Sequence, residues 1–504
     1  MANSVATLAL FSWPVVILIL FQKFDRPLAV MLGLLGGFLL LPVEGGIDFP
    51  LLPSFEKYSI PSLAVLAFVY MMRPKSSDPA SLPGLFPAGG LPKLLIAGVV
   101  IGSFLTVLTN QDPLSYGPRY IRGLRVYDAF SFVMQTGIIL LPLLLARKLL
   151  GHPDQQRRFL IVICVAALGY SLLALYEVRM SPQLNRMIYG FFPHSWLQHI
   201  RGGGYRPLVF LSHGLVLAGF FMGTILAATA LMRMHKGSER SKYLLAALWL
   251  FMTLVLSNSL GALILSILFT PVVFFLGTRG QLLVAAVVAV LVIFYPISRG
   301  AGILPINWLQ TTATNFDASR GASMGTRLFN EERLLDHASK RPLFGWGGWG
   351  RNRVYEENGA NTTITDGYWT IAITGGGWVR YLSEFMLLGL PVVLLFLRRR
   401  RYEIGPEGAA LALITAVWMI ELVPNSSLTT ALWMAAGSLW GRLEYARVTE
   451  NTPDEVETDL IESESPYTRM PHKYRRRGPK APAPDMIPGS SYARSLRTNL
   501  SKSS

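Results

Sequence analysis

The sequence predicts an all-α polytopic integral membrane protein with about 12–13 transmembrane helices and one large extracytoplasmic loop between late spans. Three observations support this fold class. Only 15% of the 504 residues are charged, whereas about a quarter are charged in an average soluble chain. Hydrophobic residues make up 51% of the chain, and its mean hydropathy is +0.40. Apolar runs of about 15–25 residues alternate with short charged segments, as in chains that cross a bilayer repeatedly.

The apolar runs give the order of the expected spans. The first run has no basic segment before it and no small-residue cleavage site, so we expect a retained span and not a signal peptide. At Ser257-Asn258-Ser259 a short polar passage divides a long apolar stretch, which leaves open a hairpin turn or a break inside the membrane. The expected spans are 5–21, 27–43, 58–72, 94–110, 128–146, 159–176, 208–232, 243–257, 259–276, 281–296, 378–397, 409–423 and 428–443.

Positive charge is concentrated in every second connection between these spans. The net charge of +16 suggests nucleic-acid binding at first sight, but Lys and Arg collect in the cytoplasmic loops of membrane proteins, so no nucleic acid is predicted. The basic connections run from Lys23 and Arg26 to the four arginines at 398–401. Their side is predicted to be cytoplasmic. The connection 297–377 is therefore expected to face outward, into the periplasm if the cell is Gram-negative.

Three regions are expected along the chain. Residues 1–443 form the transmembrane domain, and 297–377 form a large periplasmic loop with helical content inserted in it. Residues 444–504 are predicted to be a disordered cytoplasmic tail. They carry an acidic block at 454–464 and a basic block at 473–480, with too few large apolar residues to compensate the entropy of ordering.

Several classes of function are excluded by what the sequence lacks. The single Cys164 excludes disulfides within the chain and cysteine metal clusters. There is no P-loop, no HExxH and no G-x-S-x-G, and the span centres are almost free of charge, unlike an ion pathway. GWGGWG at 345–350 matches G-x-G-x-x-G, but in an outward loop it indicates tight turns with Trp346 and Trp349 at the membrane interface. Neither a metal nor a cofactor is predicted.

Arginine and glycine are crowded into two outward segments, the passage 320–369 and the RGGGYR sequence at 201–206. A guanidinium group engages phosphate oxygens bidentately, so this pattern predicts a pyrophosphate site. The alternative for any one arginine is an ordinary ion pair in a small folded cap, because Asp and Glu are also frequent in the loop. The candidate pyrophosphate ligands are Arg201, Arg206, Arg327 and Arg351.

Candidate acid–base groups lie in the same segments. Asp366 in TDGYW, just before the next span, is either a turn residue or a general base within reach of an acceptor hydroxyl. His213, Tyr368 and His337 are secondary candidates. The alternative for His213 is a hydrogen bond to a neighbouring helix, and for His337 a place on the face of the helix EERLLDH.

Three passages together resemble the O-antigen ligase and Wzy-type polymerase superfamily. RGGGYRPLVFLSHGLVLAGFF at 201–221 resembles its Arg-Gly segment leading into a span. LVLSNSLGALILSILF at 254–269 resembles its Ser-Arg-Gly-Ala span, with Leu260 where Arg is common. GTRLFNEERLLDHASKRPLFGWGGWG at 325–350 resembles its loop arginine, short helix and Arg-Pro-Leu-x-Gly-x-Gly pattern. The resemblance covers about residues 200–400.

The resemblance implies a GT-C-like, metal-independent glycosyltransferase without a cofactor. The donor would be a glycan on undecaprenyl pyrophosphate, and the acceptor a sugar hydroxyl. By position, Arg327 corresponds to the loop arginine that engages pyrophosphate, and Arg206 or Arg201 to the arginine ahead of the span. Ligases carry a His in a His-Asn-x-Tyr-like passage where this chain has Asp366-Gly367-Tyr368. This departure favours an exopolysaccharide or O-antigen polymerase, in which Asp366 is the base, over lipid A–core ligation.

Other readings remain open. An O-antigen ligase differs in using lipid A–core as the acceptor, and a transporter or flippase of lipid-linked sugars would also need an anion-binding cavity. A membrane scaffold without activity would tolerate wholesale substitution of the arginine-rich loop. The expected partners are the lipid-linked donor, the glycan acceptor and the bilayer, with a chain-length regulator and export machinery as further candidates.

Overall fold

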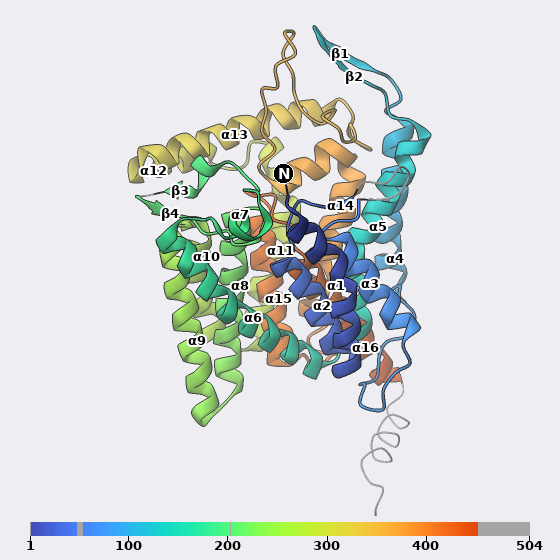
Figure 1. Cartoon of the computed structure of the whole chain (residues 1–504), viewed down its shortest axis with the longest axis vertical. Helices are drawn as coiled ribbons and strands as arrows, with labels where there is room; N and C mark the ends of the chain where they lie inside the picture. Colours follow the sequence, from blue (N-terminus) through green and yellow to red (C-terminus); the bar gives the residue numbers. More distant parts are fainter. Residues whose placement is uncertain (1, 48–53, 202, 452–504) are drawn as a thin grey trace, which may run out of the picture. The chain divides into compact units, whose positions relative to one another are not determined.

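The computed structural model describes residues 2–47, 54–201 and 203–451 of the chain. Within them the protein is an all-α polytopic membrane protein, with strands confined to short hairpins (Figure 1). The charged blocks of the expected tail lie outside the described residues. The expected boundary at 444 falls inside a helix, because α16 continues to Asn451 and Glu444 forms an ion pair with Arg147 of α5.

The helices follow the expected spans in order. Each predicted span falls on a helix, and seven of the described helices are long and apolar enough to cross a membrane. The elements are α1 Ser4–Lys23, α2 Arg26–Leu40, α3 Ser59–Met71, α4 Gly90–Leu108, β1 Leu114–Tyr116, β2 Arg119–Ile121, α5 Val126–Leu149, α6 Pro153–Met180, α7 Leu184–Tyr189, the 3₁₀ turn Trp196–His199, β3 Ile200–Arg201, β4 Gly204–Tyr205, α8 Gly214–Met234, α9 Gly237–Leu256, α10 Leu260–Phe275, α11 Thr278–Gly300, α12 Ile306–Phe316, α13 Ala318–Ser339, α14 Tyr368–Leu397, α15 Pro406–Glu421 and α16 Thr430–Asn451.

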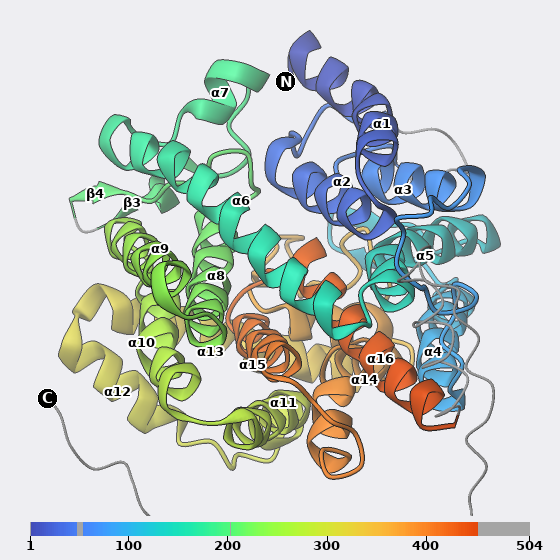
Figure 2. The same cartoon turned by 90° about the horizontal axis from the view of Figure 1, so that it is seen from below.

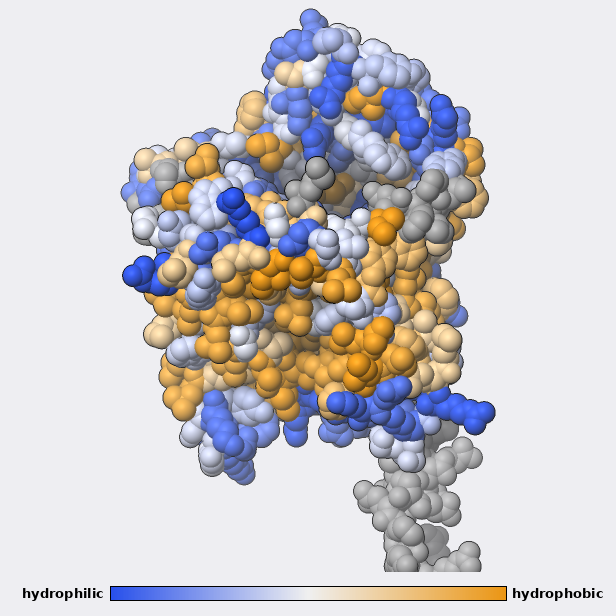
Figure 3. All heavy atoms as spheres, in the orientation of Figure 1, coloured by the Kyte–Doolittle hydropathy of each residue, from blue (hydrophilic) through white to orange (hydrophobic). Residues whose placement is uncertain are grey.

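On the face shown in Figure 3, an apolar belt lies between two polar ends of the helical bundle. Large hydrophobic side chains on the outward faces are exposed, among them Leu8 at 69%, Val165 at 61% and Leu291 at 65%. A soluble protein rarely exposes so extensive an apolar surface, whereas acyl chains cover it in a bilayer. The belt is therefore the lipid-facing surface of the protein.

Helices α8 and α15 form the enclosed centre of the bundle. Figure 2 shows α15 surrounded by α8, α11, α14 and α16, all of which it contacts. Every residue of α8 from Val216 to Met232 is buried inside the protein. These two helices matter for function because α8 begins immediately after His213 and α15 ends at Glu421, at the same polar end of the bundle.

The connections between the helices fall into two groups, one at each end of the bundle. Within each group the connections contact one another. At the end rich in Lys and Arg, Arg158 pairs with Asp25, and Arg233 donates to Leu276 O from the end of α8. At the opposite end, Arg206 donates to Asn258 O at 3.1 Å. The passage Ser257-Asn258-Ser259 is thus a turn between α9 and α10 at the end that holds Arg206, which is the hairpin alternative.

The large loop is structured and lies across this second end of the bundle. Figure 1 shows α12 and α13 running over the ends of the upright helices. The loop runs from 301 to 367, shorter than the expected 297–377, because α11 continues to Gly300 and α14 already begins at Tyr368.

A break in α14 explains the later start expected from the sequence. Gly377 has φ 67° and ψ −168°, so the helix is interrupted immediately before the apolar run. The loop supplies partners for the interrupted backbone. Trp346 N donates to Thr374 O and Gly347 N to Gly375 O, both at 2.8 Å. A Cβ on Gly345 would lie 2.6 Å from Gly377 N, so glycine is required for this approach.

Candidate functional site

Helix α13 holds Arg327 on the face that packs onto the bundle. Asn330, Glu331, Leu334 and Ala338 follow it at helical spacing and are buried. Glu331 accepts a hydrogen bond from Tyr295 of α11 at 3.1 Å, and Arg299 donates to Leu328 O at 3.2 Å. These contacts fix the turn of α13 that carries Arg327.

The Arg327 side chain is 33% exposed and only partly engaged by the protein. Its Nη1 donates to Pro424 O at 3.0 Å, and its Nε lies 3.9 Å from the Asp366 Oδ2. Nη2 has no hydrogen-bond partner among the residues that the structure describes. A partly exposed guanidinium with an unused nitrogen is suited to bind an anionic group.

Asp366 lies beside Arg327 because hydrogen bonds hold the chain on both sides of it, at Ile364 and at Tyr368. Asn330 Oδ1 accepts a hydrogen bond from Ile364 N at 3.2 Å, which holds the segment against α13. Tyr368 N then donates to Leu422 O at 2.9 Å. Burial raises the pKa of the Asp366 carboxyl, and the positive charge of Arg327 opposes the shift only in part. A carboxylate with a raised pKa is a better proton acceptor than an ordinary surface Asp.

Two further polar residues join this pair from the end of α15. Glu421 is buried and accepts a hydrogen bond from Asn425 Nδ2 at 2.6 Å. Asn425 Oδ1 lies 3.5 Å from Arg327 Nη1, and the charge of Arg327 also acts on Glu421. The sequence analysis missed both. Their only signal is an acidic residue closing an apolar run four positions before an Asn.

Arg206 and His213 approach the same place from the segment before α8. A Cβ on Gly214 would lie 2.5 Å from Arg206 Cγ, so the glycine makes room for the arginine. Burial, followed by the neighbouring His199 and His194 and the positive charges of Arg206 and Arg327, lowers the pKa of His213 to about 3. His213 is therefore neutral, and its Nδ1 accepts from Leu215 N at 3.0 Å. The remaining hydrogen is on Nε2, where it is available to a ligand.

Three histidine rings are packed against one another beside Arg206. The ring centroids of His194 and His213 are 4.7 Å apart, and those of His199 and His213 are 4.9 Å apart. Burial lowers the pKa of His199 to about 4, so this ring is neutral too. Within the described part of the chain, no three or more His, Cys, Asp or Glu side chains are arranged so that they could hold a metal ion.

Arg351 and His337 lie apart from this cluster and support the loop. The Arg351 guanidinium is fully buried, donates to Asp112 O at 2.8 Å and to Trp346 O at 3.2 Å, and pairs with the Asp112 carboxylate. His337 lies 3.0 Å from Arg351 O and stacks on Trp346 with ring centroids 4.4 Å apart. The structure places neither of them beside Arg327. The side chain of Arg201, a further candidate, lies outside what the structure describes.

A second polar group joins the two sides of the break in α14. Arg380 Nε donates to Glu384 Oε1 at 2.9 Å, and Tyr368 Oη donates to Glu384 Oε2 at 2.8 Å. Tyr368 was predicted from the sequence, whereas Arg380 and Glu384 were not, because they lie in an apolar run. The signal for them was the spacing of four residues, which places both on one helix face after the three glycines.

The chain matches one known family over the part that carries Arg327 and Asp366. Residues 245–371 match the family described as O-antigen ligase. The match begins in α9 and ends in the first turns of α14, so it includes the whole large loop. No curated protein matches the sequence well enough to serve as a relative.

Proposed function

We propose that this membrane protein, whose residues 245–371 match the family described as O-antigen ligase, is a glycosyltransferase that polymerises oligosaccharide repeat units carried on undecaprenyl pyrophosphate. The observation that carries the proposal is the partly exposed Arg327 beside Asp366, at one polar end of an apolar bundle. In this reading that end faces the periplasm of a bacterial inner membrane, and the C-terminal tail is cytoplasmic.

In the proposed reaction, arginines stabilise the leaving group and Asp366 takes a proton. The acceptor hydroxyl attacks the anomeric carbon of the donor, and the bond from that carbon to the phosphate oxygen breaks. The electron pair leaves with the polyprenyl pyrophosphate, whose growing negative charge Arg327 and Arg206 balance. Asp366 removes the hydroxyl proton as the new glycosidic bond forms. The neutral His213 contributes an Nε2–H donor beside the two arginines.

The residue beside Arg327 supports polymerisation over ligation to lipid A–core. A carboxylate stands where the ligases carry a histidine, and burial raises its pKa toward the range of a useful base. The rate should therefore fall at acid pH as Asp366 takes up a proton, with a midpoint above about 3.9, the ordinary pKa of Asp. An O-antigen ligase would share the donor but require lipid A–core as the acceptor.

Two substitutions test the proposed roles in purified protein supplied with lipid-linked donor. Arg327→Lys keeps the charge but loses the planar fork, and Asp366→Asn keeps the shape but cannot accept a proton. Each should lower the rate of polymer formation by about 10²-fold or more, the size of effect expected for general-base catalysis or an oxyanion donor. Gel electrophoresis of the glycan measures the product.

Matched controls come from the same loop. Arg353→Lys and Asp336→Asn change exposed residues and should leave the rate unchanged. Full polymer from the Arg327→Lys or Asp366→Asn protein would refute the assigned role of that residue. A flippase would instead move labelled donor across a vesicle membrane and form no polymer from it.

A further inference from the structure

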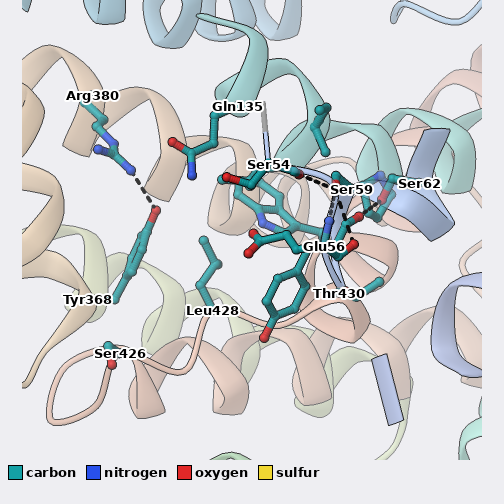
Figure 4. A pocket seen from close by; sticks show the side chains of 15 residues that line it. Ser54, Glu56, Ser59, Ser62, Gln135, Tyr368, Arg380, Ser426, Leu428 and Thr430 are labelled. Carbon is teal, nitrogen blue, oxygen red and sulfur yellow. Dashed lines mark hydrogen bonds between the residues drawn. The ribbon is translucent and has the colours of Figure 1, made fainter. Parts of the chain in front are cut away.

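A cavity of about 320 Å³ lies next to the segment that carries Asp366. Its wall is built from the residues before and at the start of α3, from α5 and α14, and from the connection between α15 and α16 together with the first turns of α16 (Figure 4). The volume is within the range of about 300–1,000 Å³ that is usual for small-molecule sites. None of the sequence motifs predicted it, because its residues are brought together from four separate parts of the chain.

The wall combines hydroxyl groups with aromatic rings. A sugar ring has apolar C–H faces and an edge of hydroxyl groups, so it needs both flat apolar surfaces and short polar side chains that donate and accept. The hydroxyl residues in the wall are Ser54, Ser59, Ser62, Ser426 and Thr430, and the aromatic ones are Tyr58, Tyr368 and Trp433.

Trp433 supplies an unused donor to this wall. Its side chain is 3% exposed, and within the described part of the chain its indole Nε1–H has no hydrogen-bond partner. A buried donor without a partner destabilises the folded protein. Trp440 on the same helix shows the usual arrangement, since its Nε1–H donates to Leu387 O at 2.9 Å. A ligand oxygen placed beside the indole would satisfy this donor.

The charges in the wall favour a neutral ligand over pyrophosphate. Arg380 is already balanced by Glu384 at 2.9 Å, and Tyr368 closes the group by donating to the same carboxylate. Glu56 adds a further carboxylate to the wall. An anion would meet no uncompensated positive charge here, unlike at Arg327, whose guanidinium is only partly engaged. Sugar hydroxyls meet both donors and acceptors.

Two short links connect the cavity to the proposed catalytic centre. Tyr368 in the wall follows Asp366 by two residues, and Ser426 in the wall follows Asn425, which contacts Arg327. A ligand in the cavity would thus be held by the same segments that carry the base and the pyrophosphate ligand.

We infer that this cavity binds the sugar that bears the attacking hydroxyl, an inference that rests on the proposed function. The ligand class is a neutral hexose or N-acetylated aminosugar at the end of the acceptor glycan. Trp433 donates to one of its oxygens, and Arg380, which is held by Glu384, forms another part of the wall. Arg327 and Arg206 hold the donor pyrophosphate separately, so the two substrates are recognised by different chemistry.

The test measures binding of a probe that lacks lipid and pyrophosphate. The probe is a set of oligosaccharides of one to three repeat units, released by partial acid hydrolysis from the polysaccharide of the source cell. Calorimetric titration into the purified protein gives Kd, and inhibition of polymer formation by the same probe gives a second measure. Trp433→Phe should raise the Kd of the probe by about 3–10-fold, because one hydrogen bond to the ligand is lost.

Trp440→Phe is the matched control on the same helix. It also removes an indole N–H, but this one has a protein partner, so it should lower thermal stability and leave probe binding unchanged. A second pair of variants changes the size of the side chain at Ser426, in the cavity wall. Ser426→Trp should abolish probe binding, and Ser426→Ala should keep it within about twofold.

Separate outcomes overturn this inference and the proposed function. Unchanged probe affinity in both Trp433→Phe and Ser426→Trp would show that the cavity does not hold the acceptor, even if polymerisation proceeds normally. Probe that binds only as well as a phospholipid, and is displaced by phospholipid, would assign the cavity to lipid. Probe binding that is lost in these variants, without any polymer formed by the wild type, would keep the sugar site and remove the polymerase.

Discussion

Asp366 shows how the requirements of catalysis and stability diverge at the scale of one residue. Its carboxyl is half-buried, and the guanidinium of Arg327 stands 3.9 Å away, beyond a direct hydrogen bond. Burial outweighs this attraction, so the pKa of Asp366 is raised. A tight ion pair would have lowered the pKa and weakened the base. The loose contact keeps the carboxylate basic and the arginine available to an anion, at a cost to the folded protein.

Asp366→Asn should therefore stabilise the protein while it lowers the rate of polymer formation. Because the folded-state pKa lies above the unfolded one, the carboxyl of the wild type favours folding below about pH 3.9 and loses this contribution as the pH rises through the folded-state value. The neutral amide carries no such pH dependence. Thermal unfolding should give a higher Tm for the variant at pH 7 and equal values at acid pH. A lower Tm at pH 7 would mean that the Arg327 contact outweighs burial.

At the scale of elements, the contact between the loop and the broken helix α14 controls the geometry of the site. The backbone of Trp346 and Gly347 pairs with the last carbonyls before Gly377, and Trp378 N donates to Pro342 O after it. The break lets one chain segment carry Tyr368 on its first turn and Arg380 just beyond, both in the wall of the same cavity. A continuous helix would leave no place for the loop backbone.

Gly377→Ala should disrupt this contact. A Cβ at this position would collide with the backbone of Leu343, and φ of 67° is unfavourable for alanine. The expected loss of stability is about 1–3 kcal/mol or more, together with a lower rate of polymer formation. Gly137→Ala in α5 is the control, since its Cβ would meet open space. Chemical unfolding monitored by tryptophan fluorescence measures the stability of both variants. Equal stability of the two would contradict the proposed role of the break.

At the scale of the whole molecule, an apolar belt separates two polar ends with different roles. The large loop, the turn at Asn258 and the connection after α15 meet at one end, where Arg206, Asp366 and Arg327 converge. The basic connections meet at the other end. Exported glycan is accessible only from outside the cytoplasm, so the proposed function requires the first end to face outward.

Cysteine labelling tests this orientation. In a Cys164→Ala background, Asn358→Cys introduces an exposed thiol in the large loop, and Ser238→Cys introduces one at the opposite end. A membrane-impermeant maleimide should label Asn358→Cys when it reaches the periplasm of intact cells, and Ser238→Cys only after lysis. The reverse pattern would place Arg327 and Asp366 in the cytoplasm and exclude a role in exported glycan.

The sequence by itself determined the fold class, the order of the spans and the loop that holds Arg327 and Asp366. Apolar runs and alternating basic connections depend on local composition, which each segment carries independently of its neighbours. Only the tertiary structure decided which polar residues meet. Arg351 and Arg327 are both loop arginines, yet one is fully buried on protein acceptors and the other is partly exposed beside a carboxylate. Glu421, Arg380 and Trp433 lie in apolar runs, and they acquire their roles only because helices distant in the chain pack side by side.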